Sequence, residues 1–448
     1  MNKLKAGYSK VQITPPMGIN IAGYFQKRFA SGVLDDLYAC TLALNVDDKT
    51  VVLVNLDVIS LDADSADVVR DYIVENTSLP RDAIFISGTH THTGPVCIHN
   101  YSRELEREYF KTLMYKICDG IRFAIEDLKD AKMGYATSNA PRISFSRRFR
   151  MKDGGVRTNP GVMHPDIVSP IGEVDERVNV VRIDRKGADD IVLVNFGTHP
   201  DTIGGDKISA DWPGFVRSTL EAALTDTKCV FFNGAQGDVN HINVFPRPGE
   251  ANGLHKDFDD VDRGYAHAKH MGNVVAGAVL QVYEKVNYVD VDSIKYTEKL
   301  IPIPANVPTP DELPLAIKYN ELHLAGKDDE IPYKGMALTT VVADAARKVR
   351  LKDGPEFFDL PLIAISVGNI VFVGIPGEPF SKIGIELKAN SPEFDMVLPC
   401  ALTNGSKGYF PAKDAYDEGG YETATSRFKA GVAEIIIEEG TKLIKSLK

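Results

Sequence analysis

Short apolar runs alternate with segments of helical spacing along the first half of the chain. Residues 50–57 (TVVLVNLD) form an apolar run that ends in polar residues, which is the pattern of a buried strand, and residues 82–87 (DAIFIS) repeat it. Residues 64–75 place apolar side chains on one side of a helix, and residues 107–129 predict a long amphipathic helix. Strands that alternate with helices in this way are typical of an α/β sheet.

The same alternation continues through the middle of the chain. Further strands are predicted over residues 190–196 and 228–232, and further helices over residues 212–224 and 263–286. Asp211 is expected to be the N-cap of the first of these helices, with Pro213 in its first turn.

Residues 287–360 interrupt the alternation. They contain a proline-rich stretch at 301–310, followed by charged segments of helical spacing. We interpret this region as an insertion or cap within a single domain that spans residues 1–448. After it, residues 362–372 contain two strand-like runs and residues 423–446 predict the last helix. The predicted fold class is α/β, with a mixed β-sheet core flanked by helices.

Polar side chains that can bind a metal follow directly after the apolar strands. In open α/β sheets, ligands bind outside the carboxyl ends of the strands, so side chains from several strand ends can share one crevice. The residues in this position are His90, His92, His199, Asp238, His241 and Glu378. Their shared position predicts an active site at the carboxyl ends of the strands.

His90 and His92 form a His-Thr-His sequence within HTHTGP. On an extended chain both imidazoles point to the same side, because side chains alternate with a period of two. Imidazole nitrogen suits zinc, so both rings could bind the metal, or one could bind it while the other takes part in catalysis. The alternative interpretation is a pair of solvated or hydrogen-bonded histidines near a Gly-Pro turn.

His199 and Glu378 each have a functional and a structural interpretation. His199 lies in FGTHP and is either a site residue or a histidine of a capped turn. Glu378 lies in GIPGEPF, where Gly377 and Pro379 hold it on a stiff turn that suits a metal ligand. It could instead be a glutamate at a helix N-terminus, stabilised by the helix dipole.

Three other segments carry weaker signals. The glycines of residues 233–241 (NGAQGDVNH) could direct backbone N–H groups at an oxyanion, with an Asx-type turn as the alternative. Arg147 and Arg148 are either solvated or directed at a substrate carbonyl or carboxylate. Tyr409 and Tyr421 lie in a glycine-rich segment and have the character of ordinary loop aromatics. The chain has no GxSxG, HExxH or P-loop motif, which argues against serine α/β-hydrolases, zincins and nucleotide binding.

Charge and cysteine content indicate which classes of binding partner and which cellular compartment suit this chain. The 448-residue chain has a net charge of −11 with both signs interspersed, which argues against a nucleic-acid-binding surface. Its 5 cysteines are widely spaced and form no CxxC pair, which favours a reducing compartment. The first residues lack the apolar segment of a signal peptide, and no stretch approaches the roughly 20 apolar residues of a membrane span. We therefore expect a cytoplasmic protein as the sequence stands, or a secreted or periplasmic one if a signal peptide has been removed.

Taken in order, these segments resemble the catalytic domain of the neutral/alkaline non-lysosomal ceramidase family. The resemblance begins at residues 7–16 (GYSKVQITPP) and continues through GTHTHTGP, NFGTHP, NGAQGDV and GIPGEPF to GYFP and YE, nearly the whole chain. Two features depart from the family pattern. Asn240 replaces the serine of the family's GDVSPN, and the family's C-terminal β-sandwich does not follow the tyrosine motif.

The resemblance implies one zinc ion per chain, with the ligands His90, His199, Glu378 and Tyr409. It implies that zinc-bound hydroxide attacks an amide carbonyl. Supporting roles then fall to three residues: proton transfer to His92, and stabilisation of the oxyanion to Arg147 and Tyr421.

The expected function is a zinc-dependent hydrolase that cleaves the linear amide bond of a small-molecule N-acyl amine, a class that includes ceramide-like lipids. Three alternatives stay open: hydrolysis of an ester or lactam at the same zinc, a polyamine- or sugar-specific deacylase, and a non-catalytic homologue that binds a lipid or other small molecule. A ceramide-like substrate would require a long apolar slot in the cleft.

Overall fold

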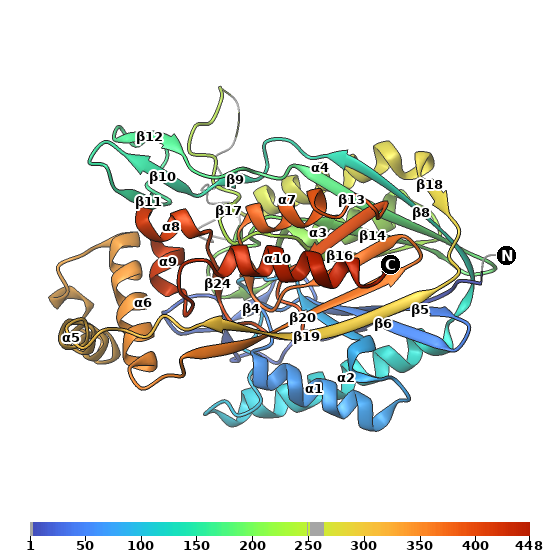
Figure 1. The fold of residues 1–448 in the computed structure, drawn as a ribbon, viewed down its shortest axis with the longest axis horizontal. Coiled ribbons are helices and arrows are strands. Elements are labelled where there is room, and N and C mark those ends of the chain that lie inside the picture. Colours follow the sequence, from blue (N-terminus) through green and yellow to red (C-terminus); the bar gives the residue numbers. More distant parts are fainter. Residues whose placement is uncertain (1–2, 249, 251–263) are drawn as a thin grey trace.

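Nine strands form the larger sheet of the structure, a computed structural model that describes residues 3–248, 250 and 264–448 (Figure 1). Their order is β16-β14-β13-β8-β1-β5-β6-β7, and β18 also pairs with β8. Neighbours are antiparallel except for two parallel pairs, β6 with β7 and β14 with β16. The strands are β1 (Lys5–Gln12), β5 (Tyr38–Val46), β6 (Lys49–Leu56), β7 (Ile84–Gly88), β8 (Lys129–Asn139), β13 (Arg177–Arg185), β14 (Asp190–Phe196), β16 (Thr227–Asn233) and β18 (Asn287–Val289).

The two edges of this sheet meet, although β16 and β7 are at opposite ends of the strand order. The rings of Phe85 in β7 and Phe232 in β16 are 5.9 Å apart. At the carboxyl end of β16, the Asn233 side chain donates to the carbonyl oxygens of Thr89 and Thr198. The segments that follow β7, β14 and β16 therefore lie together, and this closure positions the candidate site.

A second sheet of four strands has the order β19-β20-β21-β23. Its members are β19 (Ile294–Pro304), β20 (Phe357–Val367), β21 (Ile370–Gly374) and β23 (Met396–Cys400), and only β21 and β23 are parallel. One buried cluster contains side chains of both sheets, among them Leu42, Phe232, Ile365 and Phe372, so the sheets pack face to face.

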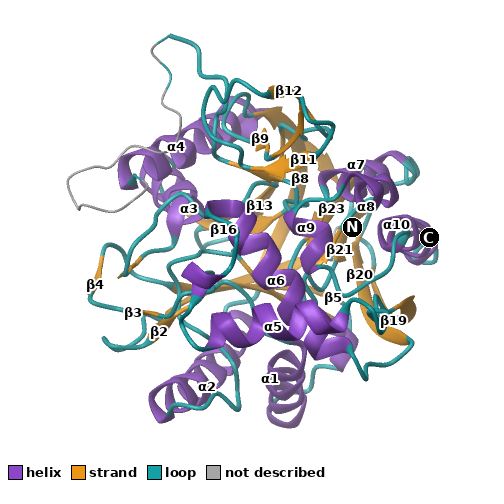
Figure 2. Ribbon diagram, turned by 90° about the vertical axis from the view of Figure 1, so that its left-hand side faces the viewer, coloured by secondary structure: helices purple, strands orange, loops and turns teal. Residues whose placement is uncertain are grey.

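Helices cover the outer faces of the sheets. The amphipathic helices α1 (Ala63–Asn76) and α2 (Glu104–Glu126) share a core with β5 and β6, whereas α3 (Asp211–Ala223) and α4 (Tyr265–Val282) cover β13, β14 and β16. On the second sheet lie α7 (Ser381–Ala389) and α10 (Val432–Lys445). Figure 2 shows α7 and α10 well separated from α1 and α2. This arrangement confirms the predicted α/β class of a mixed sheet core flanked by helices.

Three predicted details differ in the structure. Asp211 is the first residue of α3, with φ 55°, and the N-cap position belongs to Ala210. Asp211 instead accepts backbone N–H bonds from Thr202 and Ile203. The predicted last helix is two helices, α9 (Tyr421–Thr425) and α10, because Gly431 takes a left-handed conformation. The helix predicted over 263–286 begins at Tyr265, and residue 263 lies outside the described residues.

Residues 287–360 contain both sheet and helix. Their first part contributes β18 and β19, and their last residues begin β20. Between these strands lie α5 (Leu313–Leu324), a short 3-10 turn at Asp328–Glu330, and α6 (Gly335–Leu351). Figure 1 shows α5 and α6 at the end of the molecule opposite the amino terminus. Within the described residues, no helix is long and apolar enough to cross a bilayer.

Candidate metal centre

His90 lies just beyond β7 in a backbone conformation with φ 77°. A positive φ is costly for a residue with a side chain, and such strain is concentrated at functional sites. The His90 N–H donates to the Val58 carbonyl, and Nδ1 lies 2.9 Å from the Ile59 carbonyl oxygen. A carbonyl can only accept, so Nδ1 carries the proton and Nε2 presents its lone pair.

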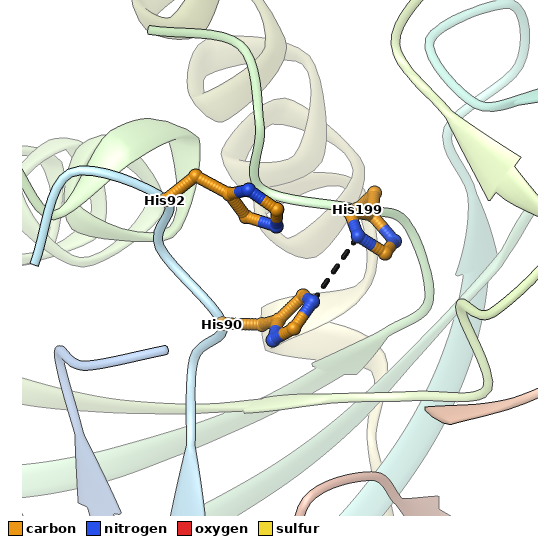
Figure 3. A group of neighbouring side chains, drawn as sticks. All are labelled: His90, His92 and His199. Atoms are coloured by element: carbon orange, nitrogen blue, oxygen red, sulfur yellow. Dashed lines mark hydrogen bonds between the residues drawn. The ribbon is translucent and has the colours of Figure 1, made fainter. Parts of the chain in front are cut away.

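His199 has the same arrangement after β14. Its Nδ1 lies 3.2 Å from the Gln236 carbonyl oxygen, in the loop that follows β16. The Nη1 of Arg147 is 3.5 Å from the same nitrogen, but a guanidinium only donates, so the closer carbonyl decides that His199 Nδ1 is protonated. Its Nε2 is therefore an acceptor and faces His90 Nε2 at 3.1 Å (Figure 3).

Glu378 brings a third acceptor to these two nitrogens. It lies in β22 (Glu378–Pro379), just after β21, and its Oε2 is 3.2 Å from His90 Nε2 and 3.7 Å from His199 Nε2. This buried oxygen has no hydrogen-bond partner among the described residues. Burial alone would raise the pKa of Glu378, but His90 and Arg147 hold that pKa below its usual range. These three polar atoms converge at one buried point, where a cation could bind them together.

The spacing of these three atoms fits a zinc ion. In a tetrahedral site with bonds of about 2.0–2.1 Å, neighbouring ligand atoms are about 3.3–3.4 Å apart. The observed separations of 3.1, 3.2 and 3.7 Å lie around this value. His90, His199 and Glu378 are therefore placed as ligands of one divalent cation would be.

His92 brings a third imidazole to the same place. One ring nitrogen from each of His90, His92 and His199 lies within 4.8 Å of the other two, so the three histidines also form a group that could hold a metal. The set that includes Glu378 has the shorter separations, and we favour it as the ligand set. Burial, followed by the charges of His90 and nearby arginines, lowers the pKa of His92 well below its usual range.

Tyr409 reaches the centre through pairing with β22. It lies in β24 (Tyr409–Phe410), which is parallel to β22 with Glu378 and Tyr409 in register. Burial, and then the Glu378 carboxylate, raise the pKa of the Tyr409 phenol well above its usual range. The Arg147 guanidinium acts in the opposite direction and lies 5.3 Å from the Tyr409 ring.

The structure separates the two adjacent arginines. Arg147 donates to the Gly237 carbonyl oxygen at 2.6 Å, forms an ion pair with Glu422 at 2.7 Å and lines the cavity beside His199. Arg148 instead bonds to Glu418 and to the Gly419 carbonyl, and its Nε lies 3.9 Å from Glu422. Of the two arginines, Arg147 lines the cavity and Arg148 does not.

A cavity of about 400 Å³ opens next to the centre. Its inner wall includes His92, His199, Arg147, Tyr409 and Tyr421, and the ring of Tyr421 lies 5.8 Å from that of Tyr409. Five of the seven residues predicted for the site thus line this cavity, and the other two, His90 and Glu378, lie within 3.1–3.7 Å of His199. The volume is within the range of small-molecule sites.

Two other strand-end residues lie apart from the centre. Asp238 accepts the N–H of Ser381 and contacts the Ser381 hydroxyl, so it joins the loop after β16 to α7. The ring of buried His241 lies 6.0 Å from that of His267 in α4. The Gly237 N–H of the glycine-rich loop donates to the Pro379 carbonyl, which leaves it bonded within the protein.

Two carboxylates of the site were not selected from the sequence. Asp201 lines the cavity, accepts the Tyr24 hydroxyl at 2.6 Å and lies 3.6 Å from His92 Nδ1. Glu422 is fully buried and pairs with Arg147. In the sequence, only their proximity to predicted site residues could have indicated these carboxylates, because Asp201 follows His199 by two residues and Glu422 follows Tyr421 directly.

No family model and no curated protein matches the chain by sequence. Its fold is similar to that of neutral ceramidase from Pseudomonas aeruginosa, with a TM-score of 0.75 and 16% identity, over 100% of this chain and 75% of that one. A structure described as ceramidase complexed with C2 gives a TM-score of 0.74 and 14% identity over the same shares. The neutral-ceramidase-like fold that the sequence resemblance implied is therefore confirmed.

Proposed function

We propose that this protein is a zinc-dependent amidohydrolase that cleaves the linear amide bond of a small-molecule N-acyl amine. The observation that carries the proposal is the convergence of His90 Nε2, His199 Nε2 and Glu378 Oε2, three buried ligand atoms 3.1–3.7 Å apart. The ceramidase-like fold supports an amide as the bond that is cleaved, because ceramide is itself an N-acyl amine.

His90, His199, Glu378 and Tyr409 would hold one zinc ion. When bound, zinc would polarise a carbonyl and lower the pKa of a coordinated water towards about 7. The carbonyls of Ile59 and Gln236 fix the two imidazoles in the tautomer that metal binding requires. The protein therefore supplies a centre that needs little reorganisation on binding.

His92, Arg147 and Tyr421 would act on the substrate from the cavity wall. Burial keeps the His92 imidazole neutral, so it can accept a proton during attack and return it to the leaving amine. Arg147 and Tyr421 offer N–H and O–H donors to the oxygen on which negative charge develops, and each such donor is typically worth about 3–4 kcal/mol. Glu422 and the Gly237 carbonyl hold the Arg147 guanidinium in position.

The ligand assignment is tested with His199→Ala. We expect this variant to lose bound zinc and at least about 10³-fold in kcat/KM for an N-acyl amine, because it removes one ligand of the ion. Zinc per chain is measured by elemental analysis, and hydrolysis is followed on an amide and on its matched ester. His164→Ala, a histidine outside the cavity that accepts the Asp166 N–H, is the control. Full zinc content in His199→Ala would refute the ligand set, and hydrolysis of the ester alone would refute amide chemistry.

A further inference from the structure

Helix α9 (Tyr421–Thr425) carries Tyr421, which lines the cavity with its ring 5.8 Å from that of Tyr409. Among the described residues, Tyr421 forms hydrogen bonds through its backbone alone, which meets the hydroxyls of Thr158 and Thr425. The direction of the phenol therefore depends on where α9 lies. The helix has 5 residues, and a helix this short gains little stability from its own hydrogen bonds, so other segments must hold it in place.

The amino-terminal end of α9 is fixed by Glu422. One oxygen of this buried carboxylate pairs with Arg147 at 2.7 Å, and the other accepts the Thr158 hydroxyl at 2.9 Å. The carboxyl end needs separate contacts, because the last carbonyls of a helix have no partner within it.

Arg347 holds the carboxyl end of α9. This residue of α6 is 5% exposed, and its Nε donates to the Ala424 carbonyl oxygen at 2.8 Å. Its Nη1 donates to the Asn306 carbonyl oxygen at 2.8 Å, and its Nη2 pairs with Asp344 at 2.7 Å. All three guanidinium nitrogens are thus engaged, and a cation at the carboxyl end of a helix also interacts favourably with the helix dipole.

Asn306 extends this connection to the chain that follows α9. Its N–H donates to the Arg427 carbonyl oxygen at 2.8 Å, so Arg347 is joined to both sides of the carboxyl end of the helix. Helices α6 and α9 pack against each other (Figure 2), and α6 also forms the outer wall of the cavity, through residues such as Met336 and Val342, together with the end of α5. One helix therefore borders the cavity and holds α9 in place.

Building on the proposed function, we propose that Arg347 is a positioning residue for amide hydrolysis: by holding the carboxyl end of α9, it directs the Tyr421 hydroxyl at the oxygen on which negative charge develops. Arg347 is not part of the cavity lining, so it acts through α9 and not on the substrate. Arg147 depends less on this contact, because the Gly237 carbonyl anchors it as well. Misplacement of a group by about 1 Å can cost on the order of 10²-fold in rate, so loss of the contact should appear in kcat.

The test is Arg347→Met, which keeps a long apolar side chain and removes the donors. We expect kcat for an N-acyl amine to fall about 10- to 100-fold, with KM within about twofold and zinc per chain unchanged, because no proposed zinc ligand lies on α9. Arg347→Lys keeps one donor group and should lose less. The matched control is Arg350→Met, one turn further along α6, where the side chain is exposed and forms no ion pair or hydrogen bond within the described part of the chain. Its kcat should equal that of the wild type.

A double-mutant comparison separates positioning from a general loss of stability. In a Tyr421→Phe chain, which lacks the hydroxyl, Arg347→Met should lower kcat by no more than about twofold, because nothing is left for Arg347 to direct. Amide hydrogen exchange over residues 421–426 supplies a readout that needs no hydrolysis. Exchange there should be faster in Arg347→Met, and to a smaller extent in Arg347→Lys, than in Arg350→Met.

Unchanged exchange over α9, or the same loss of kcat with and without the Tyr421 hydroxyl, would overturn the inference and leave the proposed function intact. Should Arg347→Met not fold, Arg347→Lys carries both comparisons. A wild-type chain that cleaves no amide would overturn the proposed function, and the role of Arg347 with it.

Discussion

At the scale of single residues, the turn after β7 sets how the two histidines of the His-Thr-His sequence lie. His90 and His92 were expected to share a side because residues of a strand alternate, but β7 ends at Gly88 and His90 has φ 77°. Their rings nevertheless lie 4.9 Å apart, because the turn after β7 and not the strand directs them. Tyr409 was nominated by family resemblance alone, since its parallel pairing with Glu378 is a tertiary feature.

Asp238 gives a prediction for pH-dependent stability. Burial raises the pKa of Asp238 to about 6, against the lowering effect of its bonds with Ser381. The Ser381 hydroxyl lies 2.6 Å from the Glu173 carbonyl oxygen and 3.0 Å from Asp238 Oδ2, so its single hydrogen is shared between two acceptors. Because the folded-state pKa exceeds the unfolded value of about 3.9, the contribution of Asp238 to the unfolding free energy falls as pH rises from about 4 to 6.

Asp238→Asn should remove this dependence, since the amide keeps an acceptor for the Ser381 N–H and supplies an N–H to its hydroxyl. We expect the stability of the variant relative to wild type to improve by up to about 3 kcal/mol between pH 4 and pH 7. Denaturant unfolding of both proteins at several pH values measures the difference. A difference that stays constant with pH would show that Asp238 does not titrate in this range.

At the scale of helices and strands, continuous apolar runs predicted strands correctly, whereas the spacing of apolar residues did not predict where a helix is broken. The predicted strand at 190–196 coincides with β14, because a continuous apolar run flanked by polar residues describes a strand covered on both faces. The last helix was predicted as one, because Phe428, Val432 and Ile436 continue the helical spacing across the break before α10. Spacing reports which side chains are buried, and it does not report the backbone conformation of Gly431.

Two glycines of α4 give an element-scale prediction. A Cβ at Gly272 would lie 2.3 Å from Phe215 Cβ and 2.9 Å from the Trp212 carbonyl oxygen, both in α3. Gly272→Ala should therefore force the two helices apart and lower the unfolding free energy by about 1–3 kcal/mol or more. A Cβ at Gly277 in the same helix meets nothing within 4 Å.

Gly277→Ala is thus the matched control, and we expect it to raise the unfolding free energy by about 0.5–1 kcal/mol through helix propensity alone. Urea unfolding followed by circular dichroism measures both variants. Equal effects of the two substitutions would mean that α3 and α4 do not pack as closely as the structure shows.

At the scale of the whole molecule, the site depends on how the larger sheet closes. His90 and His199 follow strands near opposite ends of the strand order, and they meet because Asn233 at the end of β16 bonds to Thr89 and Thr198. The second sheet then brings Glu378 to the same point from the end of β21. Residues 287–360, interpreted as an insertion or cap, supply a strand of that sheet as well as the helices of the outer cavity wall.

Zinc binding should stabilise the whole fold if the centre forms only when these segments are assembled. A ligand that binds the folded state alone adds about 2.7 kcal/mol at a free concentration of 100 times its Kd, which for a chain of this size raises Tm by roughly 2–5 °C. Thermal unfolding of metal-free protein with and without added zinc measures the shift. Magnesium, which prefers oxygen ligands, should give little change.

His90→Ala is the companion variant for this measurement. It lacks one ligand, so its Tm should respond to zinc much less than that of the wild type. An equal zinc-dependent shift in both proteins would place the stabilising ion elsewhere in the molecule.

The sequence by itself determined the α/β class, most strand positions and the polar residues at the strand ends, because these follow from local spacing and from the types of side chain present. Only the tertiary structure decided that the sheet edges meet, that a second sheet packs against the first, and that Arg147 rather than Arg148 lies beside His199. It also added Asp201 and Glu422 to the site. These outcomes depend on contacts between segments far apart along the chain, and the spacing of residues within one segment carries no information about them.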